Sequence, residues 1–125
     1  MSIPKRRWMV AILAGVIVLI GIVYFGLGSV VDTSERANRT AIRSMAHAVE
    51  EYHKKFGRYP TNEEGLDVLV TTEFLQPNPT DRWGRKYNYR YPSTRKEVPF
   101  EVWTFGADGV PGGTDENKDL GNWDR

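Results

Sequence analysis

The sequence contains no cysteine, and this absence excludes disulfide bonds and thiolate metal sites. It also has almost no excess charge, because 17 basic and 16 acidic residues give a formal net charge of +1 at pH 7. Lys5, Arg6 and Arg7 supply three of the positive charges, so the rest of the chain is slightly acidic. We therefore expect no nucleic-acid-binding surface. A small domain without disulfides must be stabilised by packing, by assembly or by a metal with oxygen ligands.

Recognisable catalytic patterns are also missing from the sequence. No serine–histidine–aspartate pattern stands out, and there is no glycine-rich phosphate loop. His47 and His53 lie six residues apart on a predicted helix, so they face different sides, cannot share a metal and are interpreted as surface residues. Glu63 and Glu64 are interpreted as helix-start residues, where carboxylates suit the helix dipole. We therefore expect no enzymatic activity and no small-molecule substrate.

A long apolar run is present near the N-terminus. From Trp8 to Leu27 the sequence has no charged residue, and a helix of this length spans the roughly 30 Å of a bilayer core. The preceding Lys5, Arg6 and Arg7 predict a cytoplasmic N-terminus by the positive-inside rule. The predicted division of the chain is a cytoplasmic basic segment (1–7), a transmembrane helix (8–28) and an exported domain (29–125).

A cleaved secretory signal is the alternative interpretation of this run. Gly26, Leu27 and Gly28 before Ser29 resemble a small-residue cleavage site. The apolar run is longer than the usual signal core of about 7–15 residues, so a retained anchor is favoured.

The exported part begins with a helix signal. Asp32 and Glu35 have the spacing of a capping box, and a helix is predicted from there to Phe56, ended by Gly57. The membrane helix can also continue directly into it. Spacings of three and four place the apolar residues on one stripe. This stripe consists of Ala37, Ala41, Ile42, Met45, Ala48, Val49, Tyr52 and Phe56.

A second, shorter helix and two strands are predicted after this stripe. Thr61 and Glu64 form another capping box at the start of the short helix. The alternation of tyrosines and polar residues over 86–91 predicts a half-buried strand, and 100–105 predicts another. The fold class is therefore α+β, with a long amphipathic helix packed on a small antiparallel sheet. The residues expected to form its core together are Tyr52, Phe56, Leu66, Leu69 and Trp103.

The last twenty residues are rich in glycine and carboxylates. Calcium prefers six to eight oxygen ligands, and glycines allow a backbone to turn its carbonyls inward. The spacing differs from that of an EF-hand loop. The alternative is a plain solvated loop with a turn at Asp108 and Gly109. Composition by itself favours this plain loop over a calcium site.

The exported sequence resembles the major pseudopilin of bacterial type II secretion systems. The resemblance begins within the predicted long helix and reaches Trp123. It is carried by four ordered motifs. These are Gly57-Arg58-Tyr59-Pro60-Thr61, Glu64-Gly65-Leu66 with Leu69-Val70, Asp81-Arg82-Trp83-Gly84-Arg85 with Tyr87-Asn88-Tyr89, and Phe105-Gly106-Ala107-Asp108-Gly109 through Pro111-Gly112-Gly113 to Gly121-Asn122-Trp123.

This resemblance implies a pilin-like fold with a C-terminal calcium loop, and it reverses the preference for a plain loop. By position, the implied calcium ligands are the carbonyl of Phe105 and the carboxylates of Asp108, Asp115, Glu116 and Asp119. The resemblance also implies a single-pass protein of the bacterial inner membrane with a periplasmic C-terminal domain. The implied partners are other pseudopilins or secretion-machinery proteins, including further copies of this chain.

The N-terminus departs from the family pattern. Pseudopilins have a glycine cut by prepilin peptidase and, five residues later, a glutamate that helps subunits enter the filament. Here no glycine is followed by such a run, and no carboxylate lies between Met1 and Val31. Two hypotheses therefore stay open: a structural pseudopilin, and a membrane-anchored, calcium-stabilised binding module that does not polymerise.

Overall fold

The computed structural model describes residues 5–77 and 79–124, with only the backbone described for 5–8 and 27–32. The first four residues of the predicted cytoplasmic segment lie outside the described residues. The chain divides into two compact units, Met1–Thr33 and Ser34–Arg125. Its elements in chain order are α1 (Lys5–Phe56), α2 (Asp67–Thr71), β1 (Asn88–Arg90), β2 (Glu101–Thr104), the 3-10 helix η1 (Asp115–Asn117) and β3 (Leu120–Gly121).

The first unit consists of the N-terminal part of α1. Its segment Met9–Gly26 has a mean hydropathy of 2.7, and none of it is buried inside the chain. By length and composition this segment can cross a membrane. The helix continues through Asp32, so the helix start predicted there is wrong. In a continuous helix the amides that Asp32 was expected to cap are bonded to the preceding turn.

The second unit contains the C-terminal part of α1, whose buried face follows the predicted stripe. The buried side chains recur at spacings of four and three residues, which matches the helical period. They include Asn38, Ile42, Met45, Ala48, Val49 and Tyr52. The helix ends where expected: Gly57 has φ +71°, and its N–H donates to the His53 carbonyl at 2.8 Å. His47 is exposed and the ring of His53 stacks on Tyr59, so both are surface or rim residues as expected.

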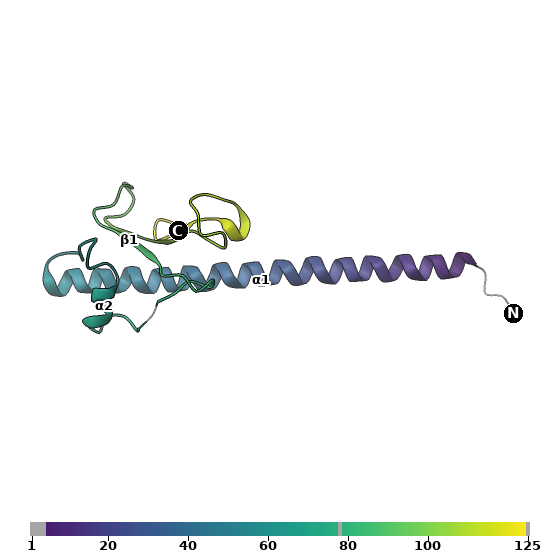
Figure 1. Cartoon of the computed structure of the whole chain (residues 1–125), viewed down its shortest axis with the longest axis horizontal. Coiled ribbons are helices and arrows are strands. Elements are labelled where there is room, and N and C mark those ends of the chain that lie inside the picture. Colours follow the sequence, from purple (N-terminus) through teal and green to yellow (C-terminus); the bar gives the residue numbers. More distant parts are fainter. Residues whose placement is uncertain (1–4, 78, 125) are drawn as a thin grey trace. The chain divides into compact units, whose positions relative to one another are not determined.

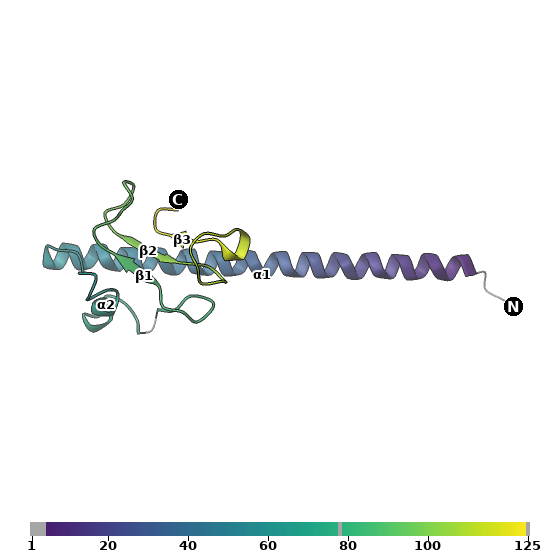
Figure 2. The same ribbon diagram turned by 45° about the horizontal axis from the view of Figure 1, so that its top comes forward.

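The sheet has three antiparallel strands in the order β1-β2-β3, and it lies along the part of α1 that belongs to the second unit (Figures 1 and 2). Successive strand residues point to opposite faces. Phe100 and Val102 therefore belong to the core cluster, while Trp103 lies on the other face against Phe105 and Trp123. The prediction that Trp103 joins the core is wrong, because the face is set by the register of β2 and not by side-chain size.

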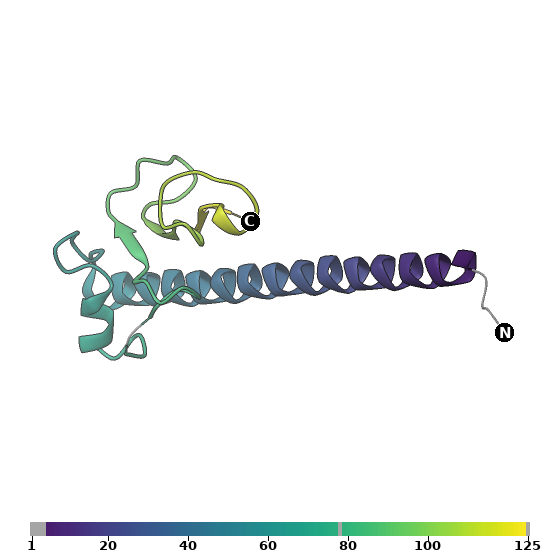
Figure 3. The ribbon, with the colours of Figure 1, turned by 45° about the vertical axis from the view of Figure 1, so that its right-hand side comes forward.

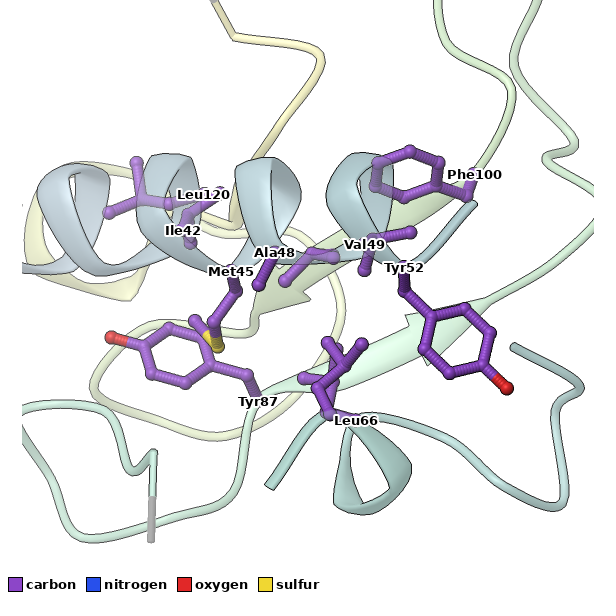
Figure 4. Close-up of a cluster of buried hydrophobic side chains, with 11 residues drawn as sticks. Ile42, Met45, Ala48, Val49, Tyr52, Leu66, Tyr87, Phe100 and Leu120 are labelled. Atoms are coloured by element: carbon purple, nitrogen blue, oxygen red, sulfur yellow. The ribbon is translucent and has the colours of Figure 1, made fainter. Parts of the chain in front are cut away.

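The core is closed by α2, which lies beside the C-terminal end of α1 (Figure 3). Leu69 is fully buried, and Leu66 is 7% exposed. Figure 4 shows Leu66 and Tyr87 facing the buried side of α1. The predicted packing of Tyr52 with both leucines is thus confirmed. Phe56 is 46% exposed, although its ring centroid lies 4.6 Å from that of Tyr52, so it covers the edge of the core.

The predicted second helix starts later than expected. The Thr61 and Glu64 capping box is present, with the Thr61 N–H donating to Glu64 Oε2 at 2.8 Å and the Glu64 N–H donating to Thr61 Oγ1 at 3.2 Å. It closes a turn, because Gly65 has φ +55° and a helix cannot run through that conformation. The helix begins two residues later, at Asp67.

Candidate calcium-binding loop

Residues 105–119 form a loop that leaves the end of β2 and returns to β3. Its backbone makes a close approach that only glycine permits at two points. Gly106 and Gly113 have φ +76° and +94°. A Cβ on either one would lie within 3.0 Å of backbone atoms of Asn117, and at Gly113 it would be 2.4 Å from the Asn117 carbonyl oxygen. The loop is therefore folded tightly against η1.

Hydrogen bonds between its own residues close the loop. The Ala107 N–H donates to the Glu116 carbonyl at 2.8 Å, and the Gly112 N–H donates to Asp119 Oδ2 at 2.9 Å. At the tip, the Val110 N–H donates to Asp108 Oδ1 at 3.2 Å. Backbone groups and short acidic side chains therefore define the shape of this loop, with no apolar core of its own.

The five predicted ligand positions lie at different places on this loop. Asp108 is exposed, and Asp115 starts η1 with a positive φ of 53°. Glu116 turns its carbonyl, and not its exposed side chain, into the loop. Phe105 directly follows β2, and its ring packs on Trp103. Among the described residues no three acidic or histidine side chains converge into a metal-holding group, so the carboxylates do not form a shared cluster.

One of the predicted ligands has an oxygen without a partner. Asp119 Oδ1 is buried and accepts no hydrogen bond within the described part of the chain. A buried acceptor of this kind costs free energy unless something binds to it. An oxygen-preferring cation is one such group. The donors of this loop are oxygens of the kind that calcium prefers, and Asp119 Oδ1 is the buried one among them.

The loop is attached to a second, tight turn that precedes β1. Asp81 and Arg85 close this turn, since the Asp81 N–H donates to the Arg85 carbonyl at 2.7 Å and Gly84 supplies a φ of +80°. The Arg85 guanidinium then reaches the loop and donates to the carbonyls of Gly106 and Ala107. Sequence reasoning used this motif only for the resemblance and missed the contact. No local pattern indicates it, because Arg85 and Gly106 lie 21 residues apart in the sequence.

The end of the loop is fixed by Asn122, which continues the pairing of β3 with its side chain. Its N–H donates to the Val102 carbonyl, its Oδ1 accepts from the Val102 N–H, and its Nδ2 donates to the Phe100 carbonyl, each at 3.0 Å. The indole of Trp123 covers Gly121 so closely that a Cβ there would lie 2.4 Å from the ring. The Gly121-Asn122-Trp123 motif therefore has a structural role: it attaches the end of the loop to β2.

A charged cluster lies near Trp123, on the outer face of the sheet. Glu101 is 4% exposed, and burial by itself raises its pKa. Hydrogen bonds from the Thr94 N–H and hydroxyl and from the Ser93 hydroxyl outweigh burial, so the pKa is lowered below the usual 4.5. Arg95 then stacks on Trp123 with its guanidinium carbon 3.8 Å from the ring centre. This cluster ties the segment between β1 and β2 to the sheet.

The sequence matches the family described as type II secretion system (T2SS), protein G, over residues 27–123. The chain belongs to this family.

Individual relatives agree with this assignment. The chain is 34% identical to the type II secretion system core protein G of Pseudomonas aeruginosa, in a match that covers 66% of each protein. It is 30% identical to the core protein G of Vibrio cholerae, over 86% of this chain and 84% of that one. The crystal structure of the major pseudopilin from the type 2 secretion system of enterohaemorrhagic Escherichia coli matches with a TM-score of 0.64 and 25% identity, over 78% and 88% of the two chains.

These findings confirm the pseudopilin resemblance and the α+β, pilin-like fold. The protein G family is a family of structural secretion-system proteins and not of enzymes. The chain is accordingly a component of the type II secretion pseudopilus or a protein related to it.

Proposed function

We propose that this protein is a pseudopilin subunit anchored in the bacterial inner membrane, with its N-terminus in the cytoplasm and the unit Ser34–Arg125 in the periplasm. The observation that carries the proposal is the segment Met9–Gly26, which is apolar and entirely exposed within the chain. Eighteen unburied apolar residues in water would drive aggregation, whereas a bilayer or neighbouring helices would cover them. The basic Lys5, Arg6 and Arg7 favour retention of the N-terminus inside.

We infer further that the exposed helix packs against the corresponding helices of other pseudopilins, including copies of this chain. Lipid tails are as apolar as the helix surface, so such packing is driven by close van der Waals contact and not by the hydrophobic effect. The named relatives are core proteins of a secretion system, and the structural relative is its major pseudopilin. Both names support assembly into a multi-subunit structure.

The loop 105–119 is proposed to bind one calcium ion that stabilises the periplasmic unit. Asp119 would supply a buried carboxylate oxygen, with Asp108 at the tip and the carbonyl of Phe105 at the base. Asp115 and Glu116 lie on η1 and would add oxygens from the far side of the loop. When bound, the ion would supply charge neutralisation for these acidic groups and fix a loop that has no apolar core.

A second candidate function is a membrane-anchored binding module that does not polymerise. It is favoured by one observation: no carboxylate lies in the segment from Met9 to Gly26. A charged residue within a membrane helix is expensive unless it is paired, so such residues usually mark a contact between subunits. The apolar segment of this chain has no such charged residue.

Crosslinking in native membranes distinguishes the two candidates. The chain has no cysteine, so single substitutions such as Val18→Cys give one reactive site per subunit, and bismaleimide then links neighbours in pairs. Two substitutions on opposite helix faces, Val16→Cys with Val18→Cys, would allow longer chains to form. A ladder of crosslinked species supports the pseudopilin subunit. Monomer only, or a single heterodimer, supports the binding module.

The proposed topology is tested with the same cysteine-free background. In intact cells with a permeabilised outer membrane, Lys96→Cys should react with a membrane-impermeant maleimide, because Lys96 is exposed in the periplasmic unit. Ser2→Cys should react only after the inner membrane is opened. Equal labelling of Ser2→Cys in intact cells would reject the proposed orientation. A mature chain that begins at Ser29 by intact mass would reject the retained anchor.

A further inference from the structure

We propose that Arg85 is the positioning residue of the calcium loop, holding one half of it in shape before the metal binds. The inference rests on the proposed calcium binding, which it deepens by naming a residue outside the acidic stretch. Arg85 lies 20 residues before Phe105 in the sequence and is not a ligand candidate, because a guanidinium has no acceptor.

The guanidinium contacts the backbone of the loop directly. Arg85 Nη2 donates to the carbonyls of Gly106 and Ala107, and Nη1 donates to the Ala107 carbonyl at 3.3 Å. The loop also passes close to Nη1 at Gly109, where an added Cβ would lie only 2.7 Å away. The planar, forked donor of one side chain thus fixes two adjacent carbonyls in the first half of the loop.

Arg85 is itself held by a buried carboxylate. Asp81 is 5% exposed, and its Oδ1 accepts the N–H groups of Trp83 at 3.0 Å and Arg85 at 2.9 Å. Its Oδ2 accepts the Thr104 hydroxyl at 2.6 Å and lies 3.6 Å from Arg85 Nε. Because Thr104 is the last residue before the loop, one carboxylate fixes both the base of the loop and the arginine that clamps it.

This arrangement divides the oxygens of the loop into two groups. The carbonyls of Gly106 and Ala107 already accept from Arg85, so they are satisfied without a metal. The buried Asp119 Oδ1 is not satisfied within the described residues, so it remains for the cation. Arg85 thus fixes Gly106 and Ala107, which lie between the proposed ligands Phe105 and Asp108, and this lowers the ordering cost of binding.

A positive charge beside a cation site could instead weaken binding by repulsion. Here Asp81 lies 3.6 Å from Arg85 Nε and offsets that charge, so the pair is nearly neutral toward the loop. Preorganisation therefore outweighs repulsion. Residues that orient a metal site from behind its ligands typically change affinity by about 10–100-fold when they are replaced.

The test is calcium titration by calorimetry on the full-length protein in detergent, with Arg85→Lys and Arg85→Gln. Lysine retains the charge and loses the forked geometry, whereas glutamine loses both. We expect both variants to bind calcium about 10–100-fold more weakly than the parent. The matched control is Arg58→Gln, because Arg58 also makes a two-pronged contact, to Glu64 at 2.7 and 2.8 Å, but does not contact the loop. It should leave calcium affinity unchanged.

Hydrogen exchange in chelator gives a readout that does not depend on the metal. The amides of Ala107 and Gly109 should exchange faster in Arg85→Gln than in the parent, while the amides of β2 stay protected. If the parent binds calcium and the Arg85 variants bind it equally well or more tightly, the inference is overturned and the calcium site stands. If the parent binds no calcium, the proposed site itself fails, and Arg85 retains only the structural role that exchange reports.

Discussion

The packed core and the acidic loop 105–119 of the unit Ser34–Arg125 are built on opposite principles. In the core, shape comes from apolar side chains: Val49, Leu69 and Val102 are all completely buried. In the loop, shape comes from glycines, backbone hydrogen bonds and one arginine, and a large apolar residue such as Val110 is 53% exposed. The core should therefore stand without any ligand, while the loop depends on contacts with charged groups.

Substitutions in the two regions should therefore act by different mechanisms. Truncating a core side chain lowers the free energy of unfolding in proportion to the apolar surface removed and the cavity left behind. A substitution in the loop lowers it by straining the backbone or by removing a hydrogen bond. These two mechanisms predict different responses to calcium, and three experiments separate them; a fourth examines an ion pair outside both regions.

The largest effect is expected in the core. Leu69→Ala should lower the free energy of unfolding by about 2–5 kcal/mol, because it removes a fully buried side chain and leaves a cavity. Chemical denaturation of the full-length protein in detergent would measure it, in calcium and in chelator. The control Val110→Ala should change it by less than about 0.5 kcal/mol, since this side chain is exposed. An unchanged midpoint for Leu69→Ala would contradict the core.

Calcium should produce the next largest effect, and only through the loop. A ligand bound by the folded form alone adds about 2.7 kcal/mol at a hundredfold excess over its dissociation constant. The melting temperature of the full-length protein should therefore fall when calcium is replaced by chelator. Asp119→Asn should remove most of this response, because it neutralises the buried oxygen that has no partner. Equal melting temperatures in the two conditions would show that the loop is an ordinary turn.

A pair of adjacent glycines tests the backbone contribution. Gly112 and Gly113 have nearly equal φ angles of +90° and +94°, so an alanine is strained at either. A Cβ on Gly112 meets nothing within 4 Å, whereas one on Gly113 meets the Asn117 carbonyl oxygen at 2.4 Å. Gly113→Ala should therefore cost more than the roughly 1–3 kcal/mol expected of conformational strain at Gly112→Ala. Thermal melting of both variants measures the difference, and equal losses would argue against the close approach.

The smallest effect concerns pH and an exposed ion pair remote from the loop. Hydrogen bonds from Arg58, and next from the Thr61 N–H, lower the pKa of Glu64 from 4.5 to about 2. The contribution of a lowered carboxyl pKa is present above the ordinary value and is lost as pH falls toward the folded one. The stability difference between the parent and Glu64→Gln should therefore shrink between about pH 5 and pH 2. Solvent screening keeps it small, so a pH-independent difference would mean that the pair is open in solution.

Much of the fold was predictable because it rests on local patterns. The stripe on α1, the end of the helix at Gly57 and the alternating tyrosines all follow from residue spacing within one element. The start at Asp32 was wrong because the same residues that cap a helix are tolerated inside a longer one. Trp103 was misplaced because an alternating strand has two faces, and the sequence does not say which one meets the helix.

The candidate site divides in the same way. The sequence by itself determined that this is an apolar anchor followed by a small domain with an acidic, glycine-rich loop, since these are properties of composition and short-range spacing. Only the tertiary structure decided that Arg85 and the buried Asp81 hold that loop, and that Asp119 alone among its acids turns a buried oxygen inward. The physical reason is separation along the chain: contacts between residues twenty or more positions apart form only when the sheet brings the two segments together, and no local pattern encodes them.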